Sequence, residues 1–240
     1  MFGYLMSGYE TAIGNGKGTR MDVVIFGLTQ QSSVTWHLLS HSGRHRVVGF
    51  TVDAAYRAME SLHGLPVVDF ERIETVFPPS ACAMIVPLGW KEMNRMRMRK
   101  VAAAREKGYE LLSFVADGAR VAPDFQARPN TIIQPGAIVA PFASIGENCS
   151  IRFGGIVSHH SSVGDHCLVA TGATISGDAR IGAYSVLGAG SVIRDCVTVA
   201  PGCFIGAGAV VVADTRENGV YLGVPARLQP TPADRLKEVN

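Results

Sequence analysis

One repeat of six residues constrains this chain more than any other feature. From residue 133 onward, a branched aliphatic residue occupies every sixth position, fourteen times without a break. These positions are Ile133, Val139, Ile145, Ile151, Val157, Val163, Val169, Ile175, Ile181, Leu187, Ile193, Val199, Ile205 and Val211. An α-helix has a hydrophobic period of 3.6 and an ordinary strand a period of 2, so neither produces this pattern.

A small residue lies four positions after most of the aliphatic residues, as at Ala137, Cys149 and Ala173. In a β-helix each hexad forms one short strand and one turn, and three hexads complete a triangular coil. The aliphatic side chain then fills the interior, and residues 18 apart stack. Glycine often follows the aliphatic residue directly, as at Gly146 and Gly164, and we expect it to provide the positive φ of the corners. The sequence therefore predicts a parallel β-helix over residues 119–228.

Residues 21–118 follow a different pattern. Apolar runs at 23–27, 45–53, 65–70, 83–89 and 109–115 alternate with helix-like segments at 31–43 and 91–108. This alternation predicts a small α/β domain with a parallel sheet. Four cations of the second helical segment are expected to form its solvated face, namely Arg95, Arg97, Arg99 and Lys100.

The loops after the predicted strands are candidates for a nucleotide site. The first strand leads into "GLTQQSS", so the G-x-G-x-x-G dinucleotide fingerprint is absent. A loop before a helix N-terminus still presents backbone N–H groups to a phosphate. We therefore expect Gly27, Leu28, Thr29 and Gly89 to contact the substrate, and Asp53 to accept a ribose hydroxyl.

Composition limits the kinds of partner. The net charge of +2 gives no support for a nucleic-acid surface. The five cysteines lack C-x-x-C spacing, which favours a reducing cytoplasm over a zinc or disulfide framework. No apolar run approaches the ~20 residues of a membrane helix, so no membrane partner is expected. Residues 1–20 lack the features of a signal peptide and are expected to be a disordered extension, and residues 229–240 a C-terminal tail.

Several motifs occur together in one order along the chain. They are "VVIFG", "GLPVV", "GWKEMNRMR", "KGYELLSFV", the uninterrupted hexads, "SHHSSVGDHC" and "GVYLGVPAR". In this order the chain resembles the bacterial sugar acetyltransferases of the sialic-acid O-acetyltransferase, bacillosamine N-acetyltransferase and perosamine N-acetyltransferase kind. The resemblance implies a left-handed β-helix that assembles as a homotrimer. It also implies acetyl-CoA in the cleft between neighbouring β-helices, and a front domain that holds the nucleotide of a nucleotide-linked sugar.

The resemblance implies a catalytic base in the "SHH" segment. The family's histidine lies five residues before a glycine, in a motif that ends with an acidic residue, and counting back from Gly164 identifies it as His159. His160 then occupies the position of the acidic residue, which is a departure from the family. We expect Asp178, 18 residues after His160, to bond to it in a relay, with Asp165 as the alternative partner.

The remaining site residues also follow from the resemblance. Gly177 lies 18 residues after His159 and is expected to supply the backbone N–H that binds the oxyanion. His159 and Gly177 then border the thioester of acetyl-CoA. The residues expected to border its adenine and phosphates are Gly208, Ala209, Gly223, Pro225 and Arg227.

The sequence therefore predicts an acetyltransferase that acts on the amino group of a nucleotide-linked sugar for a surface glycan such as O-antigen lipopolysaccharide. O-acetylation of a sugar hydroxyl remains open, because the same base serves both reactions. A non-catalytic structural or binding trimer also remains open, because the acidic residue is missing. No metal is expected, since His159, His160 and His166 lack the spacing of the zinc hydratases built on this prism. A nucleotidyltransferase is disfavoured, because no glycine-rich pyrophosphorylase loop precedes the hexads.

Overall fold

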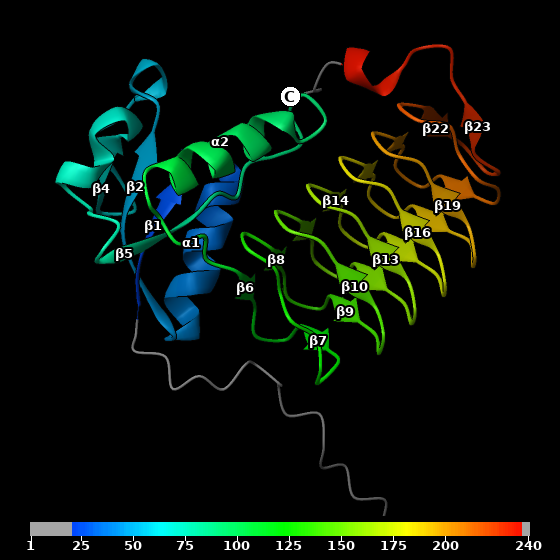
Figure 1. Ribbon diagram of the computed structural model, residues 1–240, viewed down its shortest axis with the longest axis horizontal. Coiled ribbons are helices and arrows are strands. Elements are labelled where there is room, and N and C mark those ends of the chain that lie inside the picture. The colour runs from blue at the N-terminus through cyan, green and yellow to red at the C-terminus, as the bar shows by residue number, and fades with distance from the viewer. Residues whose placement is uncertain (1–20, 237–240) are drawn as a thin grey trace, which may run out of the picture.

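The computed structural model describes residues 21–236, so the extension predicted for residues 1–20 and the last four residues of the tail lie outside it. Figure 1 shows a small α/β domain beside a prism of stacked coils, with one helix running between them. The expected fold class, an α/β domain followed by a left-handed parallel β-helix, is confirmed.

The front domain is built on a five-stranded sheet in the order β3-β4-β2-β1-β5, parallel except for β3. Its strands are β1 (Met21–Phe26), β2 (His45–Val52), β3 (Ser61–Leu62), β4 (Leu65–Asp69) and β5 (Cys82–Ile85). Buried aliphatic residues line both faces of β1, as expected for a parallel sheet covered on both sides. The carboxyl ends of β1, β2 and β5 therefore meet at one edge.

Two α-helices flank this sheet. Helix α1 (Gln30–Ser42) starts at Thr29, whose hydroxyl accepts from the Ser32 N–H, and ends at Gly43 with φ 66°. Helix α2 (Arg95–Glu106) starts later than the sequence suggested, because the three preceding residues all have positive φ. The short 3₁₀ helices are η1 (Ala54–Tyr56), η2 (Phe70–Thr75) and η3 (Ala233–Arg235).

The prism has three parallel faces. The six-stranded face holds β7 (Arg120–Val121), β9 (Ile138–Val139), β12 (Ile156–Val157), β15 (Thr174–Ile175), β18 (Val192–Ile193) and β21 (Val210–Val211). The four-stranded face holds β10 (Ser144–Ile145), β13 (Ser162–Val163), β16 (Arg180–Ile181) and β19 (Thr198–Val199). The eight-stranded face holds β6 (Phe114–Val115), β8 (Ile132–Ile133), β11 (Ser150–Ile151), β14 (Leu168–Val169), β17 (Val186–Leu187), β20 (Phe204–Ile205), β22 (Val220–Leu222) and the antiparallel β23 (Arg227–Leu228).

The hexad register is confirmed at every position. All fourteen aliphatic residues are buried and form one continuous cluster along the prism. Partners on neighbouring coils are 18 residues apart, for example Ile151 with Val169. Each buried aliphatic side chain contributes about 2 kcal/mol. The repeat therefore provides a core that no single coil has alone.

The glycines after the aliphatic residues have a different role from the expected one. Gly182 and Gly188 have φ outside the left-handed region. A Cβ on Gly182 would lie 2.4 Å from the Pro201 nitrogen, and one on Gly188 would lie 2.5 Å from the Ala207 nitrogen. These glycines therefore allow neighbouring coils to approach closely. The positive φ occurs two positions later, at the third residue after each aliphatic from Ile133 to Ile205.

The three corners of the prism differ in the residues that adopt this positive φ. The glycine corner, between the eight- and six-stranded faces, uses Gly118, Gly136, Gly154, Gly172, Gly190 and Gly208. The histidine corner, between the six- and four-stranded faces, uses Phe142, His160, Asp178 and Cys196. The asparagine corner, between the four- and eight-stranded faces, uses Asn130, Asn148, His166, Tyr184 and Gly202. A left-handed conformation costs a non-glycine residue about 1 kcal/mol, so two corners retain side chains at some expense of stability.

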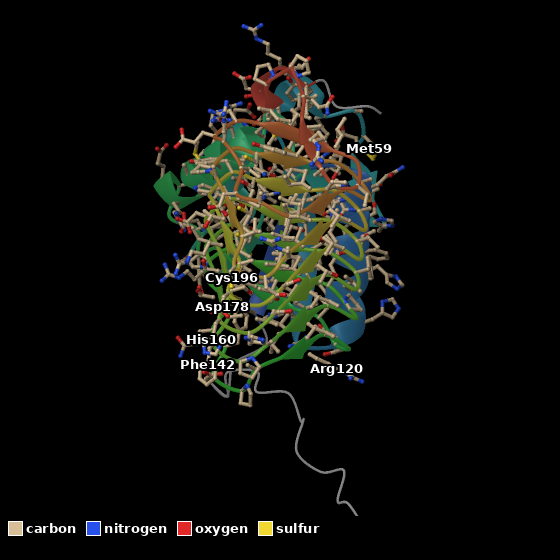
Figure 2. All side chains as sticks on the ribbon, turned by 90° about the vertical axis from the view of Figure 1, so that its right-hand side faces the viewer. Met59, Arg120, Phe142, His160, Asp178 and Cys196 are labelled. Atoms are coloured by element: carbon tan, nitrogen blue, oxygen red, sulfur yellow. The ribbon has the colours of Figure 1, made fainter. Side chains whose placement is uncertain are left out.

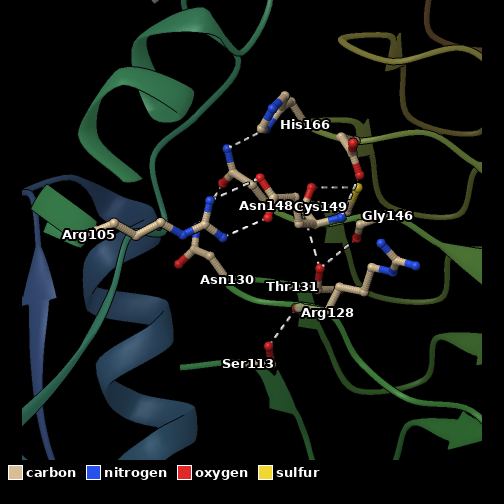
Figure 3. Close-up of polar contacts among 11 residues, drawn as sticks. Arg105, Ser113, Arg128, Asn130, Thr131, Gly146, Asn148, Cys149 and His166 are labelled. Atoms are coloured by element: carbon tan, nitrogen blue, oxygen red, sulfur yellow. Dashed lines mark hydrogen bonds and ion pairs between the residues drawn. The ribbon is translucent and has the colours of Figure 1, made fainter. Parts of the chain in front are cut away.

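The asparagine corner joins the prism to the front domain. Asn130 donates to the Asn148 side-chain oxygen at 2.7 Å, and the Asn148 amide lies 3.0 Å from His166 Nδ1 (Figure 3). Beside this stack Cys149 donates to the Gly164 carbonyl at 3.1 Å, and Thr131 donates to the Gly146 carbonyl at 2.9 Å. At this corner the position four residues after the aliphatic, held by Thr131 and Cys149, therefore favours a small side chain that is also able to donate a hydrogen bond.

Arg97 corrects the expectation that the cations of α2 form a solvated face. Its side chain is only 2% exposed and enters the seam between the two domains. It donates to the Asn148 side chain and carbonyl at 3.0 and 2.9 Å, and to the Leu88 and Cys167 carbonyls at 3.0 and 3.1 Å. Burial lowers the pKa of Arg97 to about 10, so the guanidinium stays charged. The buried Arg97 cation thus connects α2 to the loop after β5 and to the two coils that contain Asn148 and Cys167.

Two further segments differ from the sequence reading. Of the run expected as a front-domain strand, Leu111 forms an isolated parallel bridge with Met84 of β5, whereas Phe114–Val115 is a strand that pairs with β8 in the eight-stranded face. The prism therefore begins before residue 119. Within the expected tail, Ala233 is buried and its N–H donates to the Asn218 carbonyl at 2.8 Å, so this part of the segment packs on the last coil.

Candidate active site

The histidine corner is a column of side chains on successive coils. Phe142, His160, Asp178 and Cys196 lie one above another along the prism edge (Figure 2). Backbone bonds connect the coils there: the N–H of Asp178 donates to the His159 carbonyl at 3.1 Å, and that of Cys196 to the Gly177 carbonyl at 3.0 Å. The column is therefore held in register by backbone hydrogen bonds between the coils.

The two histidines lie in the turn between β12 and β13, and both are exposed. The Nδ1 atoms of His159 and His160 are 3.2 Å apart, and the rings are nearly perpendicular, at 80°. At that distance one Nδ1 carries a proton and the other accepts it. When His159 is the donor, its Nε2 keeps a free lone pair and is able to act as a base.

Gly177 lies against the His159 ring from the next coil. A Cβ on Gly177 would be 2.6 Å from His159 Cε1 and 2.9 Å from Nε2, closer than any side chain allows. No hydrogen bond from the Gly177 N–H is found within residues 21–236. A base and an unpaired backbone donor are thus adjacent on one corner, which is the pairing that acyl transfer requires.

The acidic relay is only half present in the structure. Asp178 lies on the same corner as His160, one coil on, with φ 58°. No hydrogen bond joins its carboxylate to His160 in the described part of the chain. Asp165, the alternative partner, accepts instead from the Glu147 N–H at 2.9 Å. The side chain that contacts His160 from a neighbouring coil is Phe142, with ring centroids 4.8 Å apart.

The expected substrate residues of the front domain gather at one edge. Gly27 and Thr29 follow β1, Asp53 follows β2 and Gly89 follows β5, and these strands are neighbours in the sheet. A Cβ on Gly27 would lie 2.8 Å from Leu88, so a close approach requires glycine there. This edge is where ligands bind in open parallel sheets.

Individual side chains at this edge are less free than the sequence suggested. Leu28 is partly buried and packs against the domain core. Asp53 accepts from Lys100 Nζ at 2.6 Å. Lys100 was expected on the solvated face of its helix, and the structure places it beside Asp53 instead. The Gly89 carbonyl lies 3.5 Å from the Arg97 guanidinium.

The residues expected to border coenzyme A lie elsewhere on the chain. Gly208 belongs to the glycine corner, across the six-stranded face from His159. Ala209 is fully buried, because it occupies the small-residue position four residues after Ile205. Only its backbone atoms could therefore contact coenzyme A. One chain therefore does not bring this group to His159.

The closing segment lies at the C-terminal end of the prism (Figure 1). Gly223 has φ 90°, and the Val224–Pro225 bond is cis. Arg227 is exposed, and within the described part of the chain its guanidinium donates only to the adjacent Ala226 carbonyl, at 3.3 Å. Its cation is therefore available to an anionic group.

Two kinds of site are not found within the described residues. No group of three or more histidine, cysteine or acidic side chains there has the arrangement to hold a metal ion. No helix between residues 21 and 236 has the length and hydrophobicity to cross a membrane.

Known proteins share this architecture. Residues 178–213 match the bacterial transferase hexapeptide (six repeats) family. No curated protein matches the sequence. The acetyltransferase domain of PglB from Neisseria gonorrhoeae is 23% identical, with 88% of this chain and 100% of that chain covered and a TM-score of 0.79.

PerB from Caulobacter crescentus, solved with CoA and GDP-perosamine, is 25% identical, with 87% of this chain and 97% of that chain covered and a TM-score of 0.78. A variant of GDP-perosamine N-acetyltransferase from the same organism is 24% identical, with 88% and 97% covered and a TM-score of 0.81. The similarity spans both domains in each case. The resemblance expected from the motifs is therefore confirmed at the level of fold: this chain has the two-domain, hexapeptide-repeat architecture of these bacterial acetyltransferases.

Proposed function

We propose that this protein transfers the acetyl group of acetyl-CoA to the amino group of a nucleotide-linked amino sugar. The observation that carries the proposal is the histidine corner, where the His159 ring, in contact through Nδ1 with His160, lies against Gly177, whose N–H makes no hydrogen bond within residues 21–236. The solved structures of similar fold include proteins bound to acetyl-CoA and to CoA with GDP-perosamine. These ligands supply the thioester and the amine that such a corner serves.

The proposed reaction assigns one role to each residue. The sugar ammonium loses one proton to solvent, and the resulting amine attacks the thioester carbonyl while His159 Nε2 takes a second proton from its nitrogen. The Gly177 N–H donates to the oxyanion that forms. When the carbon–sulfur bond breaks, His159 returns its proton to the leaving thiolate, so the products are the amide and free CoA. His160 keeps the His159 proton on Nδ1 and so leaves Nε2 ready as the base.

The assembly is part of the same proposal. Arg227 lies in β23 of the eight-stranded face, and the glycine corner lies across the six-stranded face from His159, so a second copy of the chain is needed to complete a CoA cleft. A homotrimer with three such clefts satisfies this geometry. The front domain then holds the nucleotide at the carboxyl ends of β1, β2 and β5. We place the enzyme in the cytoplasm, in the synthesis of a surface glycan such as O-antigen.

The test is CoA release across a panel of UDP-, dTDP- and GDP-linked 3-amino and 4-amino sugars, with hydroxyl sugars alongside. CoA should be quantified by chromatography, because the exposed Cys196 would consume a thiol reagent. We expect turnover with one amino sugar, and a loss of about 10³-fold in His159→Ala. The matched control is His41→Ala, an exposed histidine on α1.

Each outcome of the panel has a consequence. Release only with hydroxyl sugars would identify an O-acetyltransferase. Wild-type turnover in His159→Ala would remove His159 as the base. The absence of both turnover and a CoA-induced shift in melting temperature would support a non-catalytic trimer.

A further inference from the structure

Phe142 is an unusual residue for its position. Its side chain is 69% exposed, and its backbone has φ 65°. The glycine corner has glycine at every equivalent position, and glycine adopts this conformation without strain. An exposed phenyl group with a left-handed backbone is unfavourable on both counts, and such strain concentrates at functional sites.

The Phe142 ring packs against His160. The two ring centroids are 4.8 Å apart with an interplanar angle of 32°, within the range of favourable aromatic contact. His160 has a left-handed backbone of its own, with φ 58°. Its Nδ1 faces His159 Nδ1 at 3.2 Å. Phe142, His160 and His159 therefore form a continuous chain of contacts that ends at the proposed base.

The orientation of His160 has few other determinants. Within residues 21–236 its ring makes no hydrogen bond except the one to His159, and no carboxylate reaches it. If the His160 ring rotated about χ1 or χ2, Nδ1 would leave His159 and the proton of His159 would be free to move to Nε2. A His159 that is protonated on Nε2 has no lone pair there to take a proton from the sugar amine.

We propose that Phe142 is a positioning residue for acetyl transfer: its ring fixes the His160 imidazole, which in turn keeps the proton of His159 on Nδ1. The inference rests on the proposed role of His159 as the base. In an acid–histidine pair a charged group orients the histidine. Here that role falls to Phe142, an aromatic side chain on the preceding coil. Phe142 itself does not touch the reacting atoms.

The decisive variant is Phe142→Gly in the full-length protein. Glycine removes the ring and suits the backbone at φ 65°, so the fold is retained and the melting temperature is unchanged or higher. We expect kcat to fall about 3- to 10-fold, with KM for acetyl-CoA unchanged. Phe142→Tyr keeps the ring contact and should restore the wild-type rate.

The matched control is Tyr184→Gly at the asparagine corner. Tyr184 has φ 61°, and its ring lies 4.8 Å from that of His166, so this variant loses the same kind of contact away from His159. Its kcat should stay within about two-fold of wild type. An equal loss in both glycine variants would show that the effect is a general consequence of removing a stacked ring, and would overturn the proposal.

Ring-nitrogen NMR of ¹⁵N-histidine-labelled protein gives a readout that needs no substrate. We expect His159 to carry its proton on Nδ1 in wild type and in Phe142→Tyr, and to shift toward Nε2 in Phe142→Gly. An unchanged His159 tautomer in Phe142→Gly would refute the inference, whatever the activity. Failure of the proposed function would show differently, as wild-type turnover in His159→Ala or as silence with every acceptor.

Discussion

Replacing Gly177 with alanine tests the geometry of the histidine corner directly. The new Cβ would lie 2.6 Å from His159 Cε1, whereas carbon atoms in contact are about 3.5–4.0 Å apart. The His159 ring is exposed, so it moves away by about 1 Å instead of forcing the backbone apart. A displacement of that size at a catalytic group costs on the order of 10²-fold in rate. This is about 2.7 kcal/mol of transition-state stabilisation.

The assay pairs kcat with thermal unfolding. Gly177→Ala should lower kcat about 100-fold with an unchanged or slightly higher melting temperature, because alanine restricts the unfolded chain. Gly43→Ala, at the C-terminus of α1, should do the reverse: its Cβ meets no atom within 4 Å, but φ is 66°, so it costs about 1 kcal/mol of stability and leaves kcat unchanged. A Gly177→Ala enzyme within two-fold of wild type would refute the argument that the ring position against Gly177 controls the rate.

Two further predictions concern the seam between the domains. Arg97→Met removes the donor to the Leu88 and Asn148 carbonyls and one of the two donors to the Asn148 side chain and the Cys167 carbonyl. It should destabilise the protein by about 3 kcal/mol in urea unfolding, and a loss below about 1 kcal/mol would contradict this account of the seam. Burial lowers the pKa of His166, so the unfolded chain takes up this proton at a higher pH than the folded one does. Stability should therefore fall as the pH drops below about 6.5 toward the folded pKa. Urea unfolding at pH 7.5 and 5.5 should show a smaller difference in His166→Asn than in wild type.

The prism was predictable from sequence because its determinant is periodic. One aliphatic residue per hexad suffices to define the interior, and all fourteen positions are buried. The identity of the positive-φ residue was not predictable in the same way. Glycine, asparagine, histidine and even Phe142 occupy equivalent turns, since the fold tolerates a strained residue at about 1 kcal/mol per site.

The seam between the domains shows the limit of local patterns. Phe114 and Val115 read as a strand, and they form one, but apolar alternation carries no information about which sheet a strand joins. Arg97 read as one charge among four on a polar helix. Its burial depends on carbonyl acceptors from residues 88, 148 and 167, which come together only in the folded protein.

In the candidate site, too, the residues found from a repeating pattern were predictable and the contacts that depend on the folded structure were not. His159, His160 and Gly177 were identified through a motif and a spacing of 18, and the structure brings these three together. The same spacing applied backward from His160 leads to Phe142, which the sequence analysis did not consider because it searched for an acid. Asp178 was chosen on chemistry and lies on the correct corner, but its carboxylate does not reach the imidazole.

The exchange of a carboxylate for His160 changes how the tautomer of the base is controlled. A carboxylate only accepts, so it keeps a proton on the facing nitrogen by charge, whatever its own rotation. A neutral imidazole offers either a donor or an acceptor at Nδ1, so the His159 proton stays on Nδ1 only while His160 presents its lone pair there. Control therefore passes from the charge of one residue to the orientation of another. An orientation needs packing to hold it, and at this corner the packing comes from Phe142.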